Sequence, residues 1–355
     1  MKKILLINGS PKGKASNTRK LAMSFLKGLN KKNEYEIEEI ICAKLTVNDC
    51  KGCFYCWKNE EGKCAISDDM TGVFKNYLAA DIVIWSFPNY FYGMPSCVKR
   101  VMDRLLPLFV QNLNSDDGET TYHPCRFDLK NKKYILFCTC GLYNTKRNTE
   151  AIESQFKLLY EDKCDMLFCS EGQLLSNQFL DYCTIEYLNE LEKEGAKYGE
   201  CFRFSSEIKK KFAIPFLNIK EFLEFVDSSS VIKTSDKTEE EYIHDRLKSF
   251  FKSMSLTYDA SRLSVDKSVL EIQITDYPFK CQLHMNKQNC VLVTNPEHFV
   301  QYRLKVITNL YFFEGNPSLT GEKHNKRTKG PDFNMLIDLI NKFETKGITK
   351  ELKFC

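Results

Sequence analysis

The sequence predicts an α/β protein whose main part is a parallel, doubly wound sheet, followed by a smaller C-terminal α+β domain. Three observations predict this. Apolar runs alternate with segments of helical periodicity through residues 3–168. Two of the runs, 81–85 and 133–139, are almost unbroken, as in strands that are buried on both faces of a sheet. At 355 residues, the chain is long for one hydrophobic core, so two domains are expected.

The N-terminal part begins with a predicted strand at 3–8 and a glycine-containing loop. A helix follows at 19–29, where Leu21, Phe25 and Leu29 recur at helical spacing. Residues 35–41 alternate as in a second strand. The other elements predicted here are a helix at 70–78, a strand at 81–85, a helix at 95–105 that starts with a proline, a strand at 133–139, a helix at 149–160 and a strand at 164–168.

The domain organisation follows from a change in composition. Residues 1–228 form the predicted first domain, and the polar, charged stretch at 229–241 is a predicted linker. Residues 242–355 form the predicted second domain. Its expected elements are helices at 241–254 and 332–343, and strands at 269–275, 279–285 and 289–294. The basic run at 323–329 is interpreted as a solvated loop.

Three loops of the first domain leave predicted strands at one edge of the sheet, where doubly wound proteins bind their ligands. Residues 9–18 offer hydroxyls, an amide and lysines at a helix start, which suits a phosphate group. Residues 88–95 carry three aromatic side chains and a glycine, and residues 139–143 are small, permissive and aromatic. A glycine-containing turn alone is usually only a turn. The combination predicts a mononucleotide with a large ring, and FMN fits better than a dinucleotide.

The cysteines include one compact cluster. Cys50, Cys53, Cys56 and Cys64 follow the pattern C-x2-C-x2-C-x7-C. Four thiolates at this spacing can hold an iron–sulfur cluster, and they can also hold zinc in a closed structural site. The third interpretation is free thiols with a structural or redox role. Most of the other cysteines, such as Cys138, Cys169 and Cys290, are predicted to be small buried hydrophobic residues.

The loops resemble those of a known family. The segments Asn8-Gly9-Ser10-Pro11 and Ser16-Asn17-Thr18, and the later segment from Phe87 to Pro95, resemble the NADPH-dependent FMN reductase and iron–sulfur flavoprotein group. The resemblance covers residues 1 to 228, including a helical tail at 195–224, and implies a flavodoxin-like sheet. The phosphate contacts that it implies are Ser10, Lys12, Ser16, Asn17 and Thr18. The ring and ribityl contacts that it implies are Pro88, Asn89, Tyr90, Phe91, Tyr92, Gly93, Thr139, Cys140, Gly141 and Tyr143.

The same resemblance implies FMN as cofactor, NAD(P)H as co-substrate and a homodimer. It also implies a 4Fe-4S cluster on the four cysteines, although cluster-free members of the group carry a related cysteine pattern. The second domain has a faint resemblance to the sterol-carrier-type lipid-binding fold, confined to spacing and a few glycines. The alternative interpretation is that this domain mediates dimerisation or forms a lid over the flavin edge.

Composition bounds the function. The formal net charge of +4 is small for this length, and lysines and acids are interspersed. This gives no electrostatic reason to expect nucleic acid or a membrane surface as partner. We find no signal peptide or membrane span, so a cytoplasmic location is expected. The five histidines are scattered, and no acid–base pair for hydrolysis is recognised, so no catalytic side chain is nominated.

The function predicted from these features is an FMN-dependent NAD(P)H oxidoreductase, with a small-molecule or protein electron acceptor. The alternative is a non-enzymatic flavin and iron–sulfur electron carrier between protein partners. A third class, a binding module whose first domain has lost its cofactor, is disfavoured by the intact phosphate and ring loops.

Overall fold

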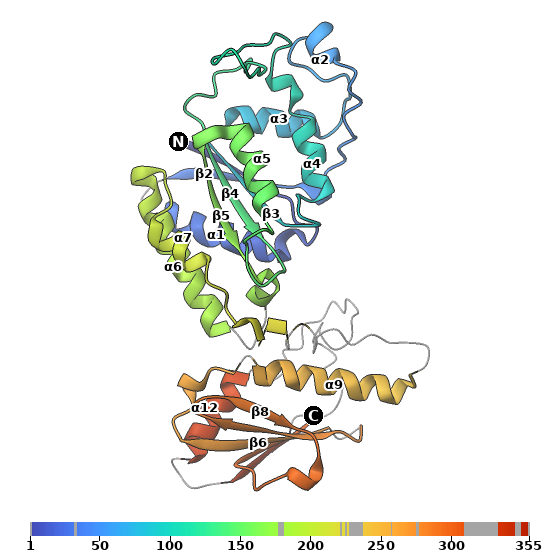
Figure 1. Cartoon of the computed structure of the whole chain (residues 1–355), viewed down its shortest axis with the longest axis vertical. Helices are drawn as coiled ribbons and strands as arrows, with labels where there is room; N and C mark the ends of the chain where they lie inside the picture. Colours follow the sequence, from blue (N-terminus) through green and yellow to red (C-terminus); the bar gives the residue numbers. More distant parts are fainter. Residues whose placement is uncertain are drawn as a thin grey trace. The chain divides into compact units, whose positions relative to one another are not determined.

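The computed structural model describes residues 2–31, 34–176, 181–220, 222–223, 226, 237–256, 258–274, 277–308, 333–344 and 349–353. The chain divides into two compact units, which Figure 1 shows with the element labels used below. The N-terminal unit comprises Met1–Leu175 and Cys183–Phe216. The C-terminal unit comprises Ser176–Tyr182 and Leu217–Cys355. Of the predicted linker, only residues 237–241 are described, and the domain boundaries stay a prediction.

The N-terminal unit contains a parallel sheet of five strands in the order β2-β1-β3-β4-β5. This is one of the two common orders of doubly wound sheets, and the order of the strands reverses direction next to β1. The strands are β1 (Lys2–Asn8), β2 (Tyr35–Ile41), β3 (Ile82–Pro88), β4 (Lys133–Thr139) and β5 (Cys164–Cys169). All five predicted strands are confirmed, and β3 runs three residues further than the apolar run that predicted it (to Pro88 rather than Trp85).

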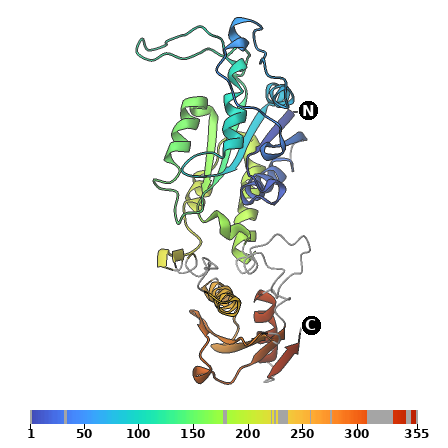
Figure 2. The same cartoon turned by 90° about the vertical axis from the view of Figure 1, so that its right-hand side faces the viewer.

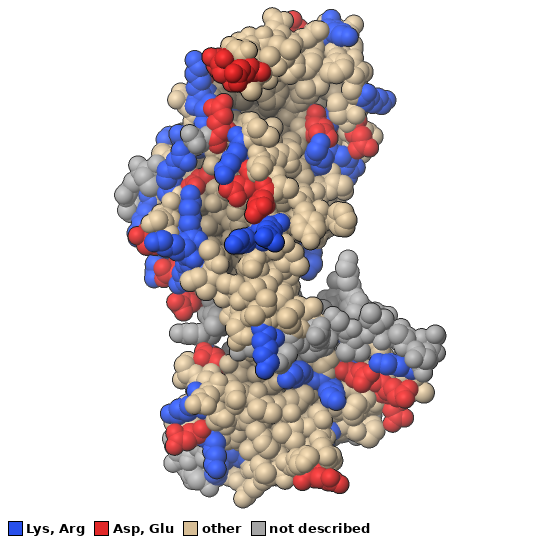
Figure 3. Space-filling view, in the orientation of Figure 1, with Lys and Arg blue, Asp and Glu red and all other residues tan. Residues whose placement is uncertain are grey.

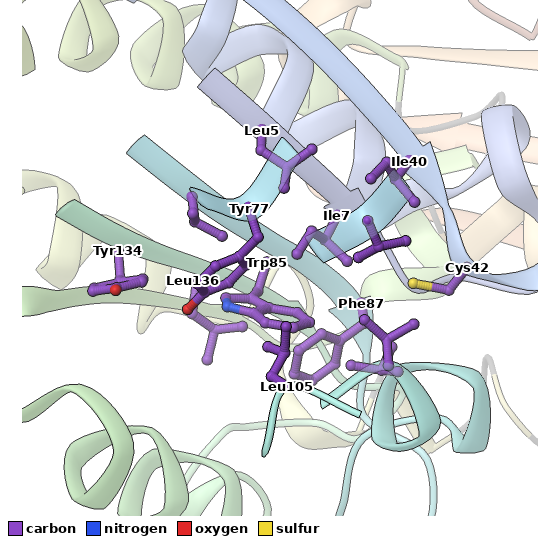
Figure 4. Close-up of a cluster of buried hydrophobic side chains, with 14 of the residues drawn as sticks. Leu5, Ile7, Ile40, Cys42, Tyr77, Trp85, Phe87, Leu105, Tyr134 and Leu136 are labelled. Atoms are coloured by element: carbon purple, nitrogen blue, oxygen red, sulfur yellow. The ribbon is translucent and has the colours of Figure 1, made fainter. Parts of the chain in front are cut away.

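Helices cover both faces of this sheet (Figures 1 and 2). The helices are α1 (Asn17–Leu29), α2 (Tyr55–Lys58), α3 (Met70–Ala79), α4 (Ser96–Asp103), α5 (Glu150–Tyr160), α6 (Asp181–Cys201) and α7 (Ser206–Phe212). Alternate strand residues enter two separate cores. One core lies under α3, α4 and α5, where Figure 4 shows Tyr77, Trp85 and Phe87 packed together. The other lies under α1, α6 and α7.

The predicted helical tail at 195–224 is wrong in its start and its continuity. Helix α6 begins at Asp181, well before residue 195. The chain then breaks at Phe202, whose φ of 53° is left-handed, and Ser205 caps a separate helix, α7, by accepting from the amide of Ile208. At Gly195 the backbones of α6 and α1 approach closely, because a Cβ on Gly195 would stand 2.1 Å from the carbonyl oxygen of Phe25. Gly195 therefore marks where α6 crosses α1, not where a helix starts.

The C-terminal unit contains a mixed sheet of five strands in the order β10-β9-β6-β7-β8. The three strands predicted in this domain are confirmed as β6 (Lys267–Ile274), β7 (Lys280–Asn286) and β8 (Cys290–Val293). Two strands were not predicted, β9 (Leu304–Thr308) and β10 (Lys350–Lys353), and β9 pairs in parallel with β6. Helices α9 (Glu239–Leu256) and α12 (Phe333–Glu344) share one hydrophobic core with the sheet.

Three sequence features of the second domain lie outside the described residues. They are the segments at 319–321 and 330–332, whose glycines contribute to the faint sterol-carrier resemblance, and the basic run at 323–329. Within the described ranges, no helix has both the length and the apolar composition needed to cross a membrane. The cytoplasmic location stays a prediction.

Candidate functional site

A cavity of about 160 Å³ lies at the carboxyl ends of the N-terminal strands. It collects residues from all three loops that the sequence singled out. Its lining comprises Ser10, Lys12, Ser16, Asn17, Thr18, Pro88, Asn89, Tyr90, Thr139, Cys140, Gly141, Gly172 and Gln173. Of the predicted contacts, only Phe91, Tyr92, Gly93 and Tyr143 do not line it. The three loops are far apart in sequence but meet at the carboxyl ends of the strands, as expected for a doubly wound sheet.

The first loop is shaped by the side chain of Asn8, which is fully buried at the end of β1. Its Nδ2 donates to the carbonyl of Gly13 at 3.0 Å, and its Oδ1 accepts from the amide of Ser10 at 3.1 Å. The Glu39 carboxylate also accepts from Asn8 Nδ2 at 3.0 Å, and the Arg19 guanidinium donates to both of its oxygens in a bidentate ion pair. The guanidinium lowers the pKa of Glu39, with burial acting against it. Asn8 thus fixes the loop before any ligand arrives.

The loop leads into the N-terminus of α1. Ser16 caps this helix by accepting from the amide of Arg19 at 3.2 Å. Thr18 and Thr139, both buried, bring their hydroxyl oxygens to 2.6 Å of each other across the sheet edge. Lys12 lines the same cavity. Hydroxyls, an ammonium and a helix N-terminus together form an environment that favours an anion.

Gly9 sits where α4 approaches the first loop. A Cβ at this position would stand 2.0 Å from Cγ2 of Val98 and 3.0 Å from Cβ of Phe87. The thiol of Cys97 donates to the Gly9 carbonyl at 3.4 Å, which ties the helix to the loop. Glycine is therefore required here by close packing rather than by an unusual backbone angle.

The second loop has a buried part around the side chain of Asn89 and an exposed tip at Phe91 and Tyr92. The backbone N–H of Asn89 donates to the carbonyl of Thr139 at 2.7 Å, and the side-chain Nδ2 of Asn89 donates to the carbonyl of Asn148 at 2.6 Å. Its Oδ1 is buried without a hydrogen-bond partner among the described residues. At the tip, Phe91 and Tyr92 have left-handed φ angles of 51° and 62°. Phe91 is 99% exposed, and Tyr92 is 56% exposed.

Two lining residues were missed by the sequence reasoning. Gly172 and Gln173 follow β5, a fourth strand end to which the loop argument was not applied. Asn17 donates from Nδ2 to the Gly172 carbonyl at 2.7 Å, and Gln173 donates to the Gly141 carbonyl at 3.2 Å. A Cβ on Gly172 would meet the Cβ of Thr139 at 2.7 Å. The glycine three residues after the end of β5 was the available signal.

The four predicted metal ligands line one small cavity of about 20 Å³ beside α2. Cys56 is buried, Cys64 is partly exposed, and Cys50 and Cys53 are exposed. Burial raises the pKa of the Cys56 thiol, and its three neighbouring cysteines act in the same direction. Within the described ranges, no three Cys, His, Asp or Glu side chains stand in an arrangement that would hold a metal ion. The four thiols line one cavity and have the chemistry to hold an iron–sulfur cluster or zinc. In this structure, however, they are arranged as free thiols.

A buried ion pair anchors the cysteine segment. Arg104, which is 2% exposed, donates to both carboxylate oxygens of Asp68 at 2.8 and 3.0 Å. It also donates to the carbonyls of Asn48 and Ile66, which flank the four cysteines. Burial opposes the charge of Asp68, but the bonds from Arg104 and from the amides of Asn48 and Met70 outweigh it. They lower the pKa of Asp68 to about 2.

The other cysteines behave largely as predicted. Cys138 and Cys169 are buried in the strands of the first sheet. Burial raises the pKa of Cys138 well above its ordinary value and that of Cys169 to about 12. Cys290 is only partly buried. These thiols are therefore protonated packing groups near neutral pH.

The fold and the cavity together define a flavodoxin-like α/β unit. Residues 2–162 match the family described as "Flavodoxin-like fold", which confirms the predicted resemblance for this part of the chain. Among curated proteins, an iron–sulfur flavoprotein of Methanocaldococcus jannaschii is 38% identical over 106 residues, which is 30% of this chain and 53% of that protein. One of Methanosarcina thermophila is 31% identical over 110 residues, which is 31% and 56% of the two chains. The chain spans about half the length of the curated relatives it matches.

Solved structures give more distant likenesses. An FMN-dependent NADH-azoreductase of Bacillus anthracis has a TM-score of 0.43 at 15% identity, over 56% of this chain and 100% of that chain. An NAD(P)H:quinone oxidoreductase of Methanothermobacter marburgensis has a TM-score of 0.40 at 17% identity, over 55% and 94% of the two chains.

Proposed function

We propose that this protein is an FMN-dependent oxidoreductase that takes electrons from NAD(P)H and passes them to a small-molecule or protein acceptor. The observation that carries the proposal is the convergence of three separately predicted loops on one cavity. An anion-binding helix start and an aromatic loop share this cavity, which is the combination that a phosphorylated flavin requires. The curated relatives named iron–sulfur flavoproteins support the same class.

The cavity suits part of the cofactor. Pockets that enclose a whole drug-sized ligand measure roughly 300–1,000 Å³, and this one measures about 160 Å³. It would therefore hold the phosphate and ribityl chain, with the flat ring against the exposed loop at 88–93. The unpartnered Oδ1 of Asn89 would accept a hydrogen bond from an N–H of the ring.

The protein's own residues would do three things. Ser10, Ser16 and Thr18 would bind the phosphate, and Lys12 would balance its charge. The aromatic loop would orient the ring and limit access of water to one face. FMN, when bound, supplies two-electron exchange with nicotinamides and one-electron exchange with metal centres.

A flavin titration of the purified chain tests this proposal. We expect quenching of FMN fluorescence at one site per chain, with Thr18→Val weakening binding by about tenfold through loss of one hydroxyl contact. Thr71→Val is the matched control, because Thr71 is an exposed residue of α3. Absence of FMN binding in the unsubstituted chain would overturn the proposal. Equal affinity in Thr18→Val would overturn only the assigned phosphate site.

The alternative function is an electron carrier in which FMN and an iron–sulfur cluster exchange electrons with protein partners. It is favoured by the four cysteines on one cavity and by the names of the curated relatives. Anaerobic purification with iron and sulfide assays tests it. About four irons and four sulfides per chain, with slow NAD(P)H oxidation and fast exchange with a ferredoxin, would favour the carrier. One zinc or no metal, with fast turnover of a small acceptor, would favour the simple reductase.

The proposed assembly is a homodimer. Tyr90, Phe91 and Tyr92 form an exposed aromatic tip beside the cavity, and such tips are commonly covered in assemblies. Size-exclusion chromatography with light scattering tests the proposal, and a monomeric mass would overturn it.

A further inference from the structure

The C-terminal unit has a groove of about 720 Å³ that the flavin chemistry does not use. Helices α9 and α12 pack on one face of its sheet, through residues such as Leu270 and Leu283. Val269 and His284, whose side chains alternate with those of the core residues, lie on the other face and line the groove. The volume lies within the range of small-molecule sites.

Beneath this groove lies a buried polar network. Gln282 is fully buried, and Glu271 is 2% exposed. The Nε2 of Gln282 donates to Glu271 at 2.8 Å and to the Val300 carbonyl at 2.8 Å. Its Oε1 accepts from the Val300 amide at 3.0 Å. Lys280 and Lys305 lie 3.0 and 3.5 Å from Glu271 and balance its charge.

This network fixes the tautomer of His284. Glu271 and the Val300 carbonyl can only accept, so the orientation of the Gln282 amide is determined. The Nε2 of His284 lies 2.9 Å from Gln282 Oε1, so it must donate. Burial lowers the pKa of His284, which keeps the ring neutral near pH 7. Its Nδ1 is therefore an acceptor on a ring that lines the groove.

The remaining lining sets the chemistry of an occupant. Lys267 and Arg303 are cationic, and none of the described Asp or Glu residues lines the groove. Val291 and Val300 are about half exposed, and Val269 adds apolar surface. We propose that this groove binds a small amphipathic anion, with its acidic group near Lys267 and Arg303 and its apolar part on the valines. This site is independent of the flavin proposal.

The test uses the full chain with excess FMN and the probe 8-anilinonaphthalene-1-sulfonate, an aromatic anion with a bridging N–H. We expect one saturable site by fluorescence. Val291 lies directly opposite His284 in the β7–β8 pairing, so Val291→Glu places a like charge in the groove and should weaken binding by about tenfold. Lys287→Glu is the control, because Lys287 lies in the exposed turn of the same hairpin. Lys287→Glu changes the net charge more than Val291→Glu does, but outside the groove, so the affinity for the probe should stay within about twofold of that of the unsubstituted chain.

Two further measurements identify the site and the ligand class. The imidazole C–H resonance that disappears in His284→Gln should shift when the probe is added to the unsubstituted chain. Decanoate should displace the probe, whereas decanol, with the same chain and no charge, should not. Equal binding by Val291→Glu and Lys287→Glu, an unmoved His284 resonance, or equal displacement by decanol would each overturn the proposal. None of these outcomes depends on whether FMN binds.

Discussion

At the scale of single residues, Gly9 shows how a residue without a side chain can be required by packing. Gly9→Ala would force its Cβ against Val98 and Phe87. We expect the free energy of unfolding to fall by about 1–3 kcal/mol and FMN affinity to fall with it. Gly72→Ala, in α3 with open space around the new Cβ, should instead gain up to about 1 kcal/mol. Urea denaturation of both variants checks this, and a stable Gly9→Ala variant would contradict it.

The Asp68–Arg104 pair gives a pH-dependent prediction. The pKa of Asp68 is lowered to about 2 in the folded chain, against about 4 when unfolded. Its contribution to stability is therefore complete above about pH 4 and is lost as the pH falls through about 2. Asp68→Asn leaves Arg104 buried without its charge partner, and it should cost about 3 kcal/mol at neutral pH.

The measurement is the free energy of unfolding against pH for the unsubstituted chain and the variant. Their difference should shrink as the pH falls below about 4. Asp103→Asn is the control, because Asp103 pairs with Lys99 at the surface and such pairs contribute about 0–1 kcal/mol. A constant difference between the chain and Asp68→Asn down to about pH 2 would refute the role of the ion pair.

At the scale of elements, helix α3 depends on a lysine from outside the helix. The Nζ of Lys132, a buried residue, donates to the carbonyls of Tyr77 and Leu78 at 3.0 and 3.3 Å and also to that of Ala80. Burial lowers the pKa of this ammonium group. The helix end would otherwise leave these acceptors buried without donors.

Lys132→Met should therefore destabilise the N-terminal unit by about 1–3 kcal/mol, the cost of leaving buried acceptors unsatisfied. Lys130→Met, at an exposed position two residues away, should change stability by less than about 0.5 kcal/mol. Chemical denaturation compares the two variants. Equal stabilities would show that water can replace the ammonium group.

At the scale of the whole molecule, the two units have separate hydrophobic cores, two in the N-terminal unit and one in the C-terminal unit. We therefore expect a fragment of residues 1–228 to bind FMN with the affinity of the full chain, and a fragment of residues 237–355 to unfold cooperatively. Circular dichroism and the flavin titration measure both. A 1–228 fragment that is folded but does not bind FMN would show that the cofactor site needs the C-terminal unit.

Local patterns in the sequence were enough to predict several features of the fold. The strand at 133–139 was predicted to the residue, because an unbroken apolar run has few alternatives to a buried strand. The order of strands and helices then predicted which loops share an edge, and most of the residues named in them line one cavity. The predicted helical tail was wrong in its start and its continuity, since a helix break such as that at Phe202 depends on packing rather than on composition.

How segments that are separate in sequence meet could be seen only in the folded chain. The parallel pairing of β9 with β6 joins residues that are more than thirty positions apart, and no local pattern in a short strand records its partner. The same holds for Gly172 and Gln173, which enter the cavity because β5 lies beside β4. The His284 network likewise depends on the Val300 backbone, which lies next to Gln282 only in the folded chain. Local periodicity fixes the type of an element, whereas the contacts between elements arise from burying all of the apolar faces at once.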